Sequence, residues 1–143
     1  MKYFTKKWYK NCQMTLLSKK KKLEVQCAID DYETYYRQIE SQLPDNIKRV
    51  NTDYMHDCIV LGSYFIGHNF HIDLDSEGAA YSTEKVELVN AEIAEGNTHL
   101  NGAHWIYDEI YIQKDRYELH ILFWHRKRGL EEIVVQFDDV IIT

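Results

Sequence analysis

Residues 105–124 read WIYDEIYIQKDRYELHILFW, two apolar-rich runs that flank a short charged connection. Such runs are typical of β-strands, and Lys114-Asp115 lies where a tight turn belongs. A two-residue loop and a four-residue loop over 113–116 give the same register, whereas a three-residue loop would shift it. The sequence therefore predicts a β-hairpin around Lys114-Asp115, although this pair lacks the glycine that tight hairpins favour.

Alternation along the two strands sorts the hairpin side chains onto two faces. One face is almost entirely apolar, with Ile112 opposite Tyr117, Ile110 opposite Leu119, Asp108 opposite Ile121 and Ile106 opposite Phe123. The other face is aromatic and polar, with Tyr111 opposite Glu118, Glu109 opposite His120, Tyr107 opposite Leu122 and Trp105 opposite Trp124. Because directly opposed Cβ atoms lie about 4.5–5.5 Å apart, we expect Glu109 and His120 to be within reach of each other.

We predict a ligand-binding site on the aromatic and polar face, formed by Trp105, Tyr107, Glu109, Tyr111, Glu118, His120 and Trp124. Aromatic walls around a few polar groups are the usual composition of a small-molecule site. The carboxylates and the imidazole are also ordinary ligands of a divalent metal, and Glu109 with His120 could form an acid–base pair. The simpler interpretation is a hydrogen-bonded, structural Glu–His pair beneath a helix. We assign no catalytic residue, no metal ligand and no cofactor.

The N-terminal third is predicted to be helical. A short helix is expected over 4–17, with Thr5 as its N-cap and one face formed by Trp8, Cys12 and Leu16. The lysines of 19–22 are assigned to a solvated loop. A long helix is expected over 23–43, ending before Pro44, with a buried stripe formed by Val25, Ile29, Tyr32, Tyr36, Ile39 and Leu43. The next ten residues are ambiguous and allow a short helix that begins at Asp45.

The rest of the chain is predicted to form strands. Residues 58–67 and 68–74 are two of them, the second with Phe70, Ile72 and Leu74 on one face and a solvated His71 on the other. Residues 84–95 have high helix propensity, yet they lie between strands with short connections and are assigned to a strand. A last strand is expected over 130–142. We therefore predict an α+β fold, with N-terminal helices packed on a five- or six-stranded, mostly antiparallel meander sheet.

The length of 143 residues is that of one ordinary domain. We expect a single domain over 1–143, with a helical part at 1–44 and an antiparallel sheet part at 55–143. Which face of the hairpin the helices cover is left open by the sequence. If they cover the face of Ile and Leu, the face of Glu109 and His120 is open to a ligand.

Composition and charge restrict the possible partners. The net charge of −6 argues against nucleic acid as the main partner, because that affinity depends on neutralising phosphates. The longest apolar runs fall short of the roughly 20 residues that cross a bilayer, and the opening MKYFTKKWYK lacks the apolar core of a signal peptide. Three scattered cysteines show no metal or redox spacing. We therefore expect a cytoplasmic protein that does not act at membranes.

Three stretches carry a resemblance to a known family. The opening MKYFTKKWY, the step Met55-His56-Asp57 and the stretch from Trp105 to His120 resemble a family of uncharacterised proteins from Gram-positive bacteria, whose members open with a MKYFTKxWY-like motif and carry a WxYxE…YELH hairpin. The resemblance spans most of the chain, which is shorter than usual between the first helix and His56. It implies a bacterial cytoplasmic protein and supplies no activity and no catalytic residue.

Motifs of known catalytic mechanism are absent from the sequence, including a glycine-rich phosphate loop, a Gly-x-Ser-x-Gly elbow and a His-Glu-x-x-His helix. Together with the aromatic sheet face and the acidic charge, this favours a small non-enzymatic binding or protein-interaction module, of an accessory or immunity-like kind. Its partner would be another protein or a small molecule. The alternative hypothesis is a small-molecule or metal-dependent enzyme centred on Glu109, Glu118 and His120.

Overall fold

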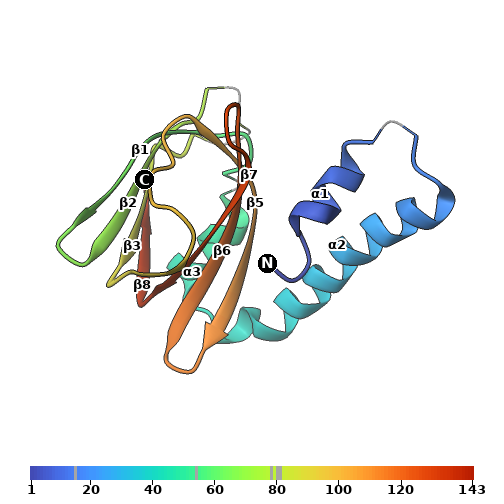
Figure 1. Ribbon diagram of the computed structural model, residues 1–143. Coiled ribbons are helices and arrows are strands. Elements are labelled where there is room, and N and C mark those ends of the chain that lie inside the picture. Colours follow the sequence, from blue (N-terminus) through green and yellow to red (C-terminus); the bar gives the residue numbers. More distant parts are fainter. Residues whose placement is uncertain (15, 54, 78, 80–81) are drawn as a thin grey trace.

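The computed structural model describes residues 1–143 except 15, 54, 78 and 80–81 (Figure 1). The described residues form, in chain order, α1 (Lys6–Cys12), α2 (Lys19–Ile39), the 3-10 turn η1 (Glu40–Gln42), α3 (Asp45–Thr52), β1 (Ile59–Ile66), β2 (Asn69–Asp75), β3 (Lys85–Val89), β4 (Glu92–Glu95), β5 (Ala103–Gln113), β6 (Arg116–His125), β7 (Gly129–Phe137) and β8 (Asp139–Ile142). The class is α+β with an antiparallel sheet, as predicted.

The hairpin of β5 and β6 has the predicted turn and, over most of its length, the predicted register. Gln113 pairs with Arg116 around Lys114-Asp115, and Lys114 takes a positive φ of 54°. The pairs between Ile112–Tyr117 and Tyr107–Leu122 are those expected from alternation. The prediction that Glu109 lies opposite His120 is therefore confirmed.

A β-bulge between Trp105 and Tyr107 ends this agreement. Trp105 pairs with Phe123, and His104 pairs with Trp124, so the predicted pairs Ile106–Phe123 and Trp105–Trp124 are wrong. The extra residue reverses the direction of the Trp105 side chain, which is fully buried with its ring 5.4 Å from that of Phe123. Trp105 thus belongs to the core rather than to the aromatic and polar face.

The sheet has eight strands over the described residues, in the order β4-β7-β6-β5-β1-β2-β3-β8, rather than the five or six predicted. The count differs because two long runs are each interrupted once. The predicted strand 84–95 divides at Asn90, which has a φ of 53°, and the predicted strand 130–142 divides at Asp138. The halves still pair, β3 with β8 and β4 with β7, so the sheet curls on itself and each edge strand continues an inner strand (Figure 1).

The first helix is shorter than predicted. Thr5 is its N-cap, as expected, and accepts a hydrogen bond from the N–H of Trp8 at 3.1 Å. The helix ends at Cys12, however, and Leu16 is 91% exposed. The prediction that Leu16 lies on the buried face is therefore wrong.

The second helix begins earlier than predicted. The hydroxyl of Ser18 accepts a hydrogen bond from the N–H of Lys21 at 3.4 Å and caps the helix there. The lysines of 19–22, which were assigned to a loop, form its first turn. The buried stripe is confirmed at Tyr32, Tyr36 and Ile39. The ambiguous segment after Pro44 is the helix α3, with Ile47 and Val50 buried.

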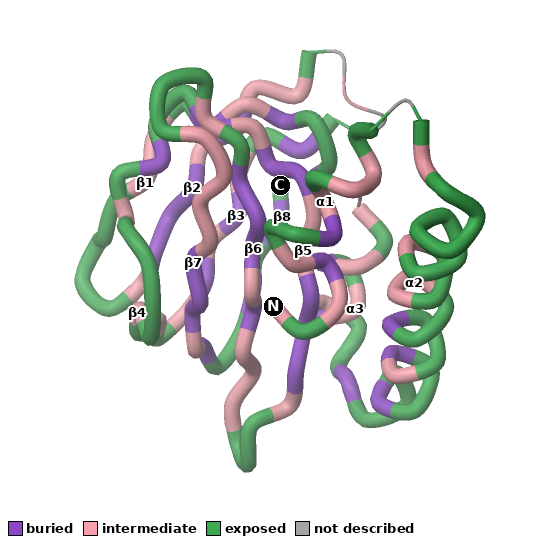
Figure 2. Tube along the Cα trace, turned by 45° about the vertical axis from the view of Figure 1, so that its right-hand side comes forward, coloured by how far each residue is buried: buried purple, intermediate pink, exposed green. Residues whose placement is uncertain are grey.

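Strand residues form most of the core, and the buried strand positions are purple in Figure 2. Large buried side chains come from nearly every strand: Phe70, Ile72, Leu88, Trp105, Ile110, Leu119, Ile121, Phe123, Ile133 and Phe137. The same cluster includes residues of the helical part, namely Tyr36, Ile39, Leu43, Ile47 and Val50. His71 was predicted to be solvated but is only 4% exposed, because the ring of Tyr64 stacks on it at 5.4 Å.

Candidate ligand-binding site

The aromatic and polar face of the hairpin is occupied by the start of the chain. Residues 1–12, here called the N-terminal arm, lie between the hairpin and α2 (Figure 1). The carboxylate of Glu109 accepts hydrogen bonds from the backbone N–H groups of Lys2 at 2.7 Å, Tyr3 at 2.9 Å and Phe4 at 2.6 Å. Glu109 is fully buried as a result.

Tyr111 completes the surroundings of Glu109. The hydroxyl of Tyr111 donates to its carboxylate, and burial together with this carboxylate raises the pKa of Tyr111. The ammonium of Lys2 lies 4.7 Å from the centre of the Tyr111 ring, a cation–π contact. The hydrogen bonds from the arm N–H groups to the Glu109 carboxylate are charge-assisted, and such bonds are roughly twice as strong as neutral ones. Glu109 is therefore the main polar anchor of the N-terminal arm.

His120 takes part in the same arrangement, and its two ring nitrogens reach groups other than Glu109. One ring nitrogen of His120, Nδ1, lies 2.8 Å from the amino nitrogen of Met1, which also contacts Glu132. The other nitrogen, Nε2, lies 2.8 Å from the carboxylate of Glu118. Burial alone would raise the pKa of Glu118, but hydrogen bonds from His120 and Gln136 outweigh this effect and hold the pKa below its ordinary value.

The other predicted site residues are dispersed. Trp105 is in the core, and Trp124 is 39% exposed beside His104. Tyr107 belongs to an aromatic cluster in which its ring lies 5.2 Å from Phe4 and 5.0 Å from Trp8. The structure therefore brings Glu109, Tyr111, Glu118 and His120 together beneath the N-terminal arm, and it does not bring Trp105 or Trp124 to them.

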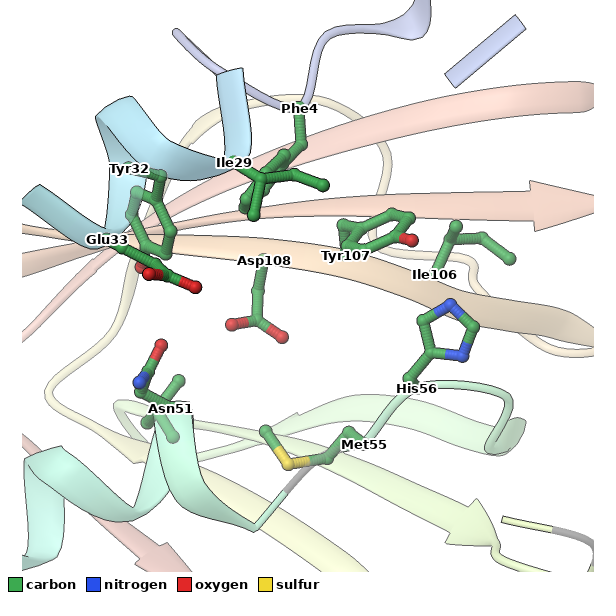
Figure 3. Close-up of a pocket in the computed structure, with 11 residues that line it drawn as sticks. Phe4, Ile29, Tyr32, Glu33, Asn51, Met55, His56, Ile106, Tyr107 and Asp108 are labelled. Atoms are coloured by element: carbon green, nitrogen blue, oxygen red, sulfur yellow. The ribbon is translucent and has the colours of Figure 1, made fainter. Parts of the chain in front are cut away.

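A pocket of about 350 Å³ lies at the edge of this cluster, between the N-terminal arm, α2, α3 and β5 (Figure 3). Its walls are mostly apolar and aromatic. The polar groups that reach it come from Glu33, Asn51, His56, Tyr107 and Asp108, and the remaining lining residues are Phe4, Ile29, Tyr32, Val50, Met55 and Ile106. Lys and Arg are absent from these lining residues, so the fixed charge of the described pocket wall is negative.

Asp108 is central to this pocket. Figure 3 shows its carboxylate pointing into the space between Asn51, Met55 and Tyr107. Burial raises the pKa of Asp108 to about 7, although the indole N–H of Trp105, which donates to this carboxylate at 2.8 Å, opposes the increase. The carboxyl is therefore poised to change its charge near neutral pH, which is common at functional sites.

Asp108 lies opposite Ile121 on the apolar face of the hairpin, as predicted, but it was not among the predicted site residues. The available signal was that a single carboxylate stood among isoleucine, leucine and phenylalanine in that face. A buried charge without a partner is unfavourable, so its presence there indicates a polar partner or a cavity. The contribution of Asn51 and His56 carried no such signal, because it depends on how α3 and the following segment approach β5.

The sequence is similar to one family model, "Protein of unknown function (DUF4085)", which matches residues 17–128. The chain belongs to this family. The match confirms the predicted resemblance to a family of unknown function, and it includes every pocket-lining residue except Phe4. No curated protein and no solved structure matches the chain.

Two further findings concern the described residues of this family member. They contain no group of three or more His, Cys, Asp or Glu side chains placed to hold a metal ion. Among the helices that the structure describes, none is long and apolar enough to cross a membrane.

Proposed function

We propose that the protein is a non-enzymatic binding module whose pocket at Asp108 takes a small organic cation with an apolar or aromatic body. The observation that supports this proposal best is the position of the Asp108 carboxyl in a mostly apolar pocket whose described lining residues include no Lys or Arg. A volume of about 350 Å³ is at the lower end of the range for ligand sites, roughly 300–1,000 Å³. It suits one ring with a short charged arm.

The electrostatics of the pocket favour a cation over a neutral or anionic ligand. An ionised carboxylate in apolar surroundings has lost much of its hydration, and a cation placed against it restores the lost interaction. The rings of Phe4, Tyr32 and Tyr107 also line the pocket, and aromatic faces attract cations. Tyr107 is the one residue of the predicted ligand-binding set that lines this pocket, and its contact with ligand is part of the proposal.

The alternative of an enzyme centred on Glu109, Glu118 and His120 is less well supported by the geometry. Three backbone N–H groups and a phenol already occupy the Glu109 carboxylate, which leaves it no lone pairs directed at a substrate. A protein-interaction role is compatible with the pocket, since the side chain of a partner's lysine or arginine carries the same chemistry as a free organic cation.

The experiment is an NMR titration that observes the ¹³C-labelled methyl groups of methionine. The chain has three methionines, of which Met55 is fully buried against the pocket. Phenethylammonium and a short aryl guanidinium are the probes, and 2-phenylethanol is the neutral control of matched shape. We expect a saturable shift of the Met55 signal with the cations and binding at least tenfold weaker with the alcohol.

Variants and pH complete the test. Asp108→Asn keeps the shape and the acceptor for the Trp105 indole but should remove the preference for the cation. Since Asp108 must lose its proton to pair with the cation, affinity should fall about tenfold for each pH unit below 7 and level off above 7. Absence of any Met55 shift with every cation, or equal binding of amine and alcohol, would refute the proposal. Tighter binding of a capped lysine or arginine derivative would assign the pocket to a partner protein's side chain.

A further inference from the structure

The N-terminal arm and the pocket share parts, and this has a functional consequence. The side chain of Phe4 forms a wall of the pocket, while the N–H of Phe4 donates to Glu109 at 2.6 Å on the other side of β5. Asp108 and Glu109 are adjacent in β5, with their side chains on opposite faces. Phe4 therefore connects Glu109, which anchors the arm, to the pocket that contains the Asp108 carboxyl.

The anchor holds the arm by its backbone, so it does not itself depend on the side chains of Lys2, Tyr3 and Phe4. Those side chains add aromatic contacts: the ring of Phe4 lies 5.0 Å from that of Tyr32, and the ring of Tyr3 lies 5.5 Å from it. Tyr32 lines the pocket as well, and its hydroxyl accepts a hydrogen bond from the N–H of Ile110 at 3.0 Å. The arm, α2 and β5 thus form one wall that is complete only when the arm is docked.

We propose that the N-terminal arm is a latch whose docking on Glu109 and whose closure of the Asp108 pocket are coupled to ligand binding. This inference rests on the proposed function of the pocket. A ligand that contacts Phe4 binds the docked state more tightly than the undocked state, and by linkage it stabilises docking by the same factor. Undocking removes Phe4, opens the pocket to water and releases the ligand.

The variant that tests the latch is Glu109→Gln, which removes the anchor of the arm and changes no residue that lines the pocket. A glutamine at this position keeps one carbonyl acceptor and replaces the other oxygen with a donor that opposes the arm N–H groups. Glu95→Gln makes the same chemical change on the exposed strand β4 and is the matched control. Should Glu109→Gln fail to fold, Lys2→Pro removes one of the three N–H groups that donate to Glu109 and leaves the sheet intact. Lys2→Ala then controls for loss of the ammonium over Tyr111.

The first measurement needs no ligand. Met1 lies in the arm, Met55 lines the pocket, and Met14 is 47% exposed outside both. The methyl signal of Met1 therefore reports on docking of the arm, that of Met55 reports on the pocket, and that of Met14 is an internal reference. In Glu109→Gln we expect the Met1 signal to sharpen and the Met55 signal to move, with Met14 unchanged. A sharpened Met1 signal with an unmoved Met55 signal would overturn the latch, whatever the pocket binds.

The second measurement uses phenethylammonium as the probe. We expect its affinity to fall about tenfold in Glu109→Gln and to be unchanged in Glu95→Gln, and we expect the probe to slow amide exchange at residues 2–4 of the wild type by a similar factor. An affinity within twofold of the wild type in Glu109→Gln, with the arm released, would also overturn the latch. Failure of the wild type to bind any cation refutes the proposed function instead, and the ligand-free measurement then decides on the latch alone.

Discussion

Asp108 and Glu109 are neighbouring carboxylates that differ in the number of donors that reach them. Glu109 meets three backbone N–H groups and a phenol, whereas Asp108 meets one indole N–H. Hydrogen bonds to the charged form favour ionisation and burial opposes it. Burial therefore dominates at Asp108 and raises its pKa to about 7. An under-satisfied charged group of this kind lowers stability, and proteins keep such groups where they serve a function.

The pKa of Asp108 makes a prediction about stability and pH. Its folded value of about 7 lies above the ordinary value of 3.8, so between these values the native state holds a proton that the unfolded state has lost. Stability from this group is complete below about pH 4, declines as pH rises to 7 and is constant above that. Asp108→Asn should therefore be more stable than the wild type at pH 8, by at most roughly 4 kcal/mol at 1.36 kcal/mol per pKa unit.

Urea unfolding at several pH values checks this prediction. The stability gain of Asp108→Asn should be near zero at pH 3 and should grow steadily to pH 7. Asp31→Asn, on the exposed side of α2, serves as the control and should show no such trend. A gain for Asp108→Asn that does not vary with pH, or a loss at pH 8, would contradict the assignment of the raised pKa to burial.

At the scale of elements, the fold depends on where the strands bend. The corner between β3 and β4 and the corner between β7 and β8 lie beside each other, since the N–H of Asp138 donates to the carbonyl of Val89 at 2.9 Å and the side chains of Asn90 and Asp138 are hydrogen-bonded at 2.8 Å. At this corner, residues 85–95 and residues 129–142 form one bent antiparallel ribbon. Its β4–β7 half is at one end of the strand order and its β3–β8 half is at the other. β4 and β8 remain the edge strands of the sheet, and each is continuous through this corner with an inner strand, β3 or β7.

Gly96, which follows β4, is a position where the element requires glycine. Its φ is 95°, and a Cβ atom there would lie 2.4 Å from the carbonyl oxygen of Glu132 and 2.9 Å from Cα of Ile133. Both neighbours are backbone atoms of β7, so relief requires a shift of the β4–β7 pairing. We expect Gly96→Ala to destabilise the protein by on the order of 2–4 kcal/mol, measured by urea unfolding.

Gly67 provides the control for this prediction. Its φ of 60° is also positive, but a Cβ atom there would meet nothing within 4 Å. Gly67→Ala should therefore cost only the conformational term, about 1–2 kcal/mol. Equal losses for the two variants would show that the close approach to β7 is unimportant.

At the scale of the whole molecule, the sequence predicted contacts between residues close in the chain and missed contacts between distant ones. The hairpin register followed from alternation on either side of Lys114-Asp115, because both partners lie within a few residues of the turn. The bulge at Ile106 left no mark in that pattern, and Trp105 was misplaced. The sequence could not predict that the N-terminal arm occupies the predicted site. Glu109 binds the backbone N–H groups of Lys2, Tyr3 and Phe4, which are more than 100 positions away in the sequence. Backbone groups have no sequence signature.

The arm and the sheet also differ in how their buried residues connect. Phe4, Trp8 and Tyr32 form an arm cluster that is distinct from the cluster filling the curled sheet, and Tyr35 packs against both. Segments with few buried contacts open without global unfolding. We therefore predict two levels of amide exchange. Amides of β6, which has hydrogen-bonded strands on both sides, should exchange at the global free energy of unfolding, and those of α1 should exchange at a lower one.

Trp8→Ala separates the two levels. Trp8 is part of the cluster with Phe4 and Tyr32, and its indole N–H donates to the carbonyl of Val25 at 3.0 Å. Loss of the Trp8 side chain should therefore remove the protection of the α1 amides. Amides of β6 should keep their protection, reduced only by the free energy that docks the arm on the sheet. Hydrogen exchange followed by NMR measures both, with Trp124→Ala as a control for removing a half-exposed tryptophan. Loss of protection in β6 together with α1 would mean that arm and sheet unfold as one unit, and a latch that moves on an intact sheet would then be excluded.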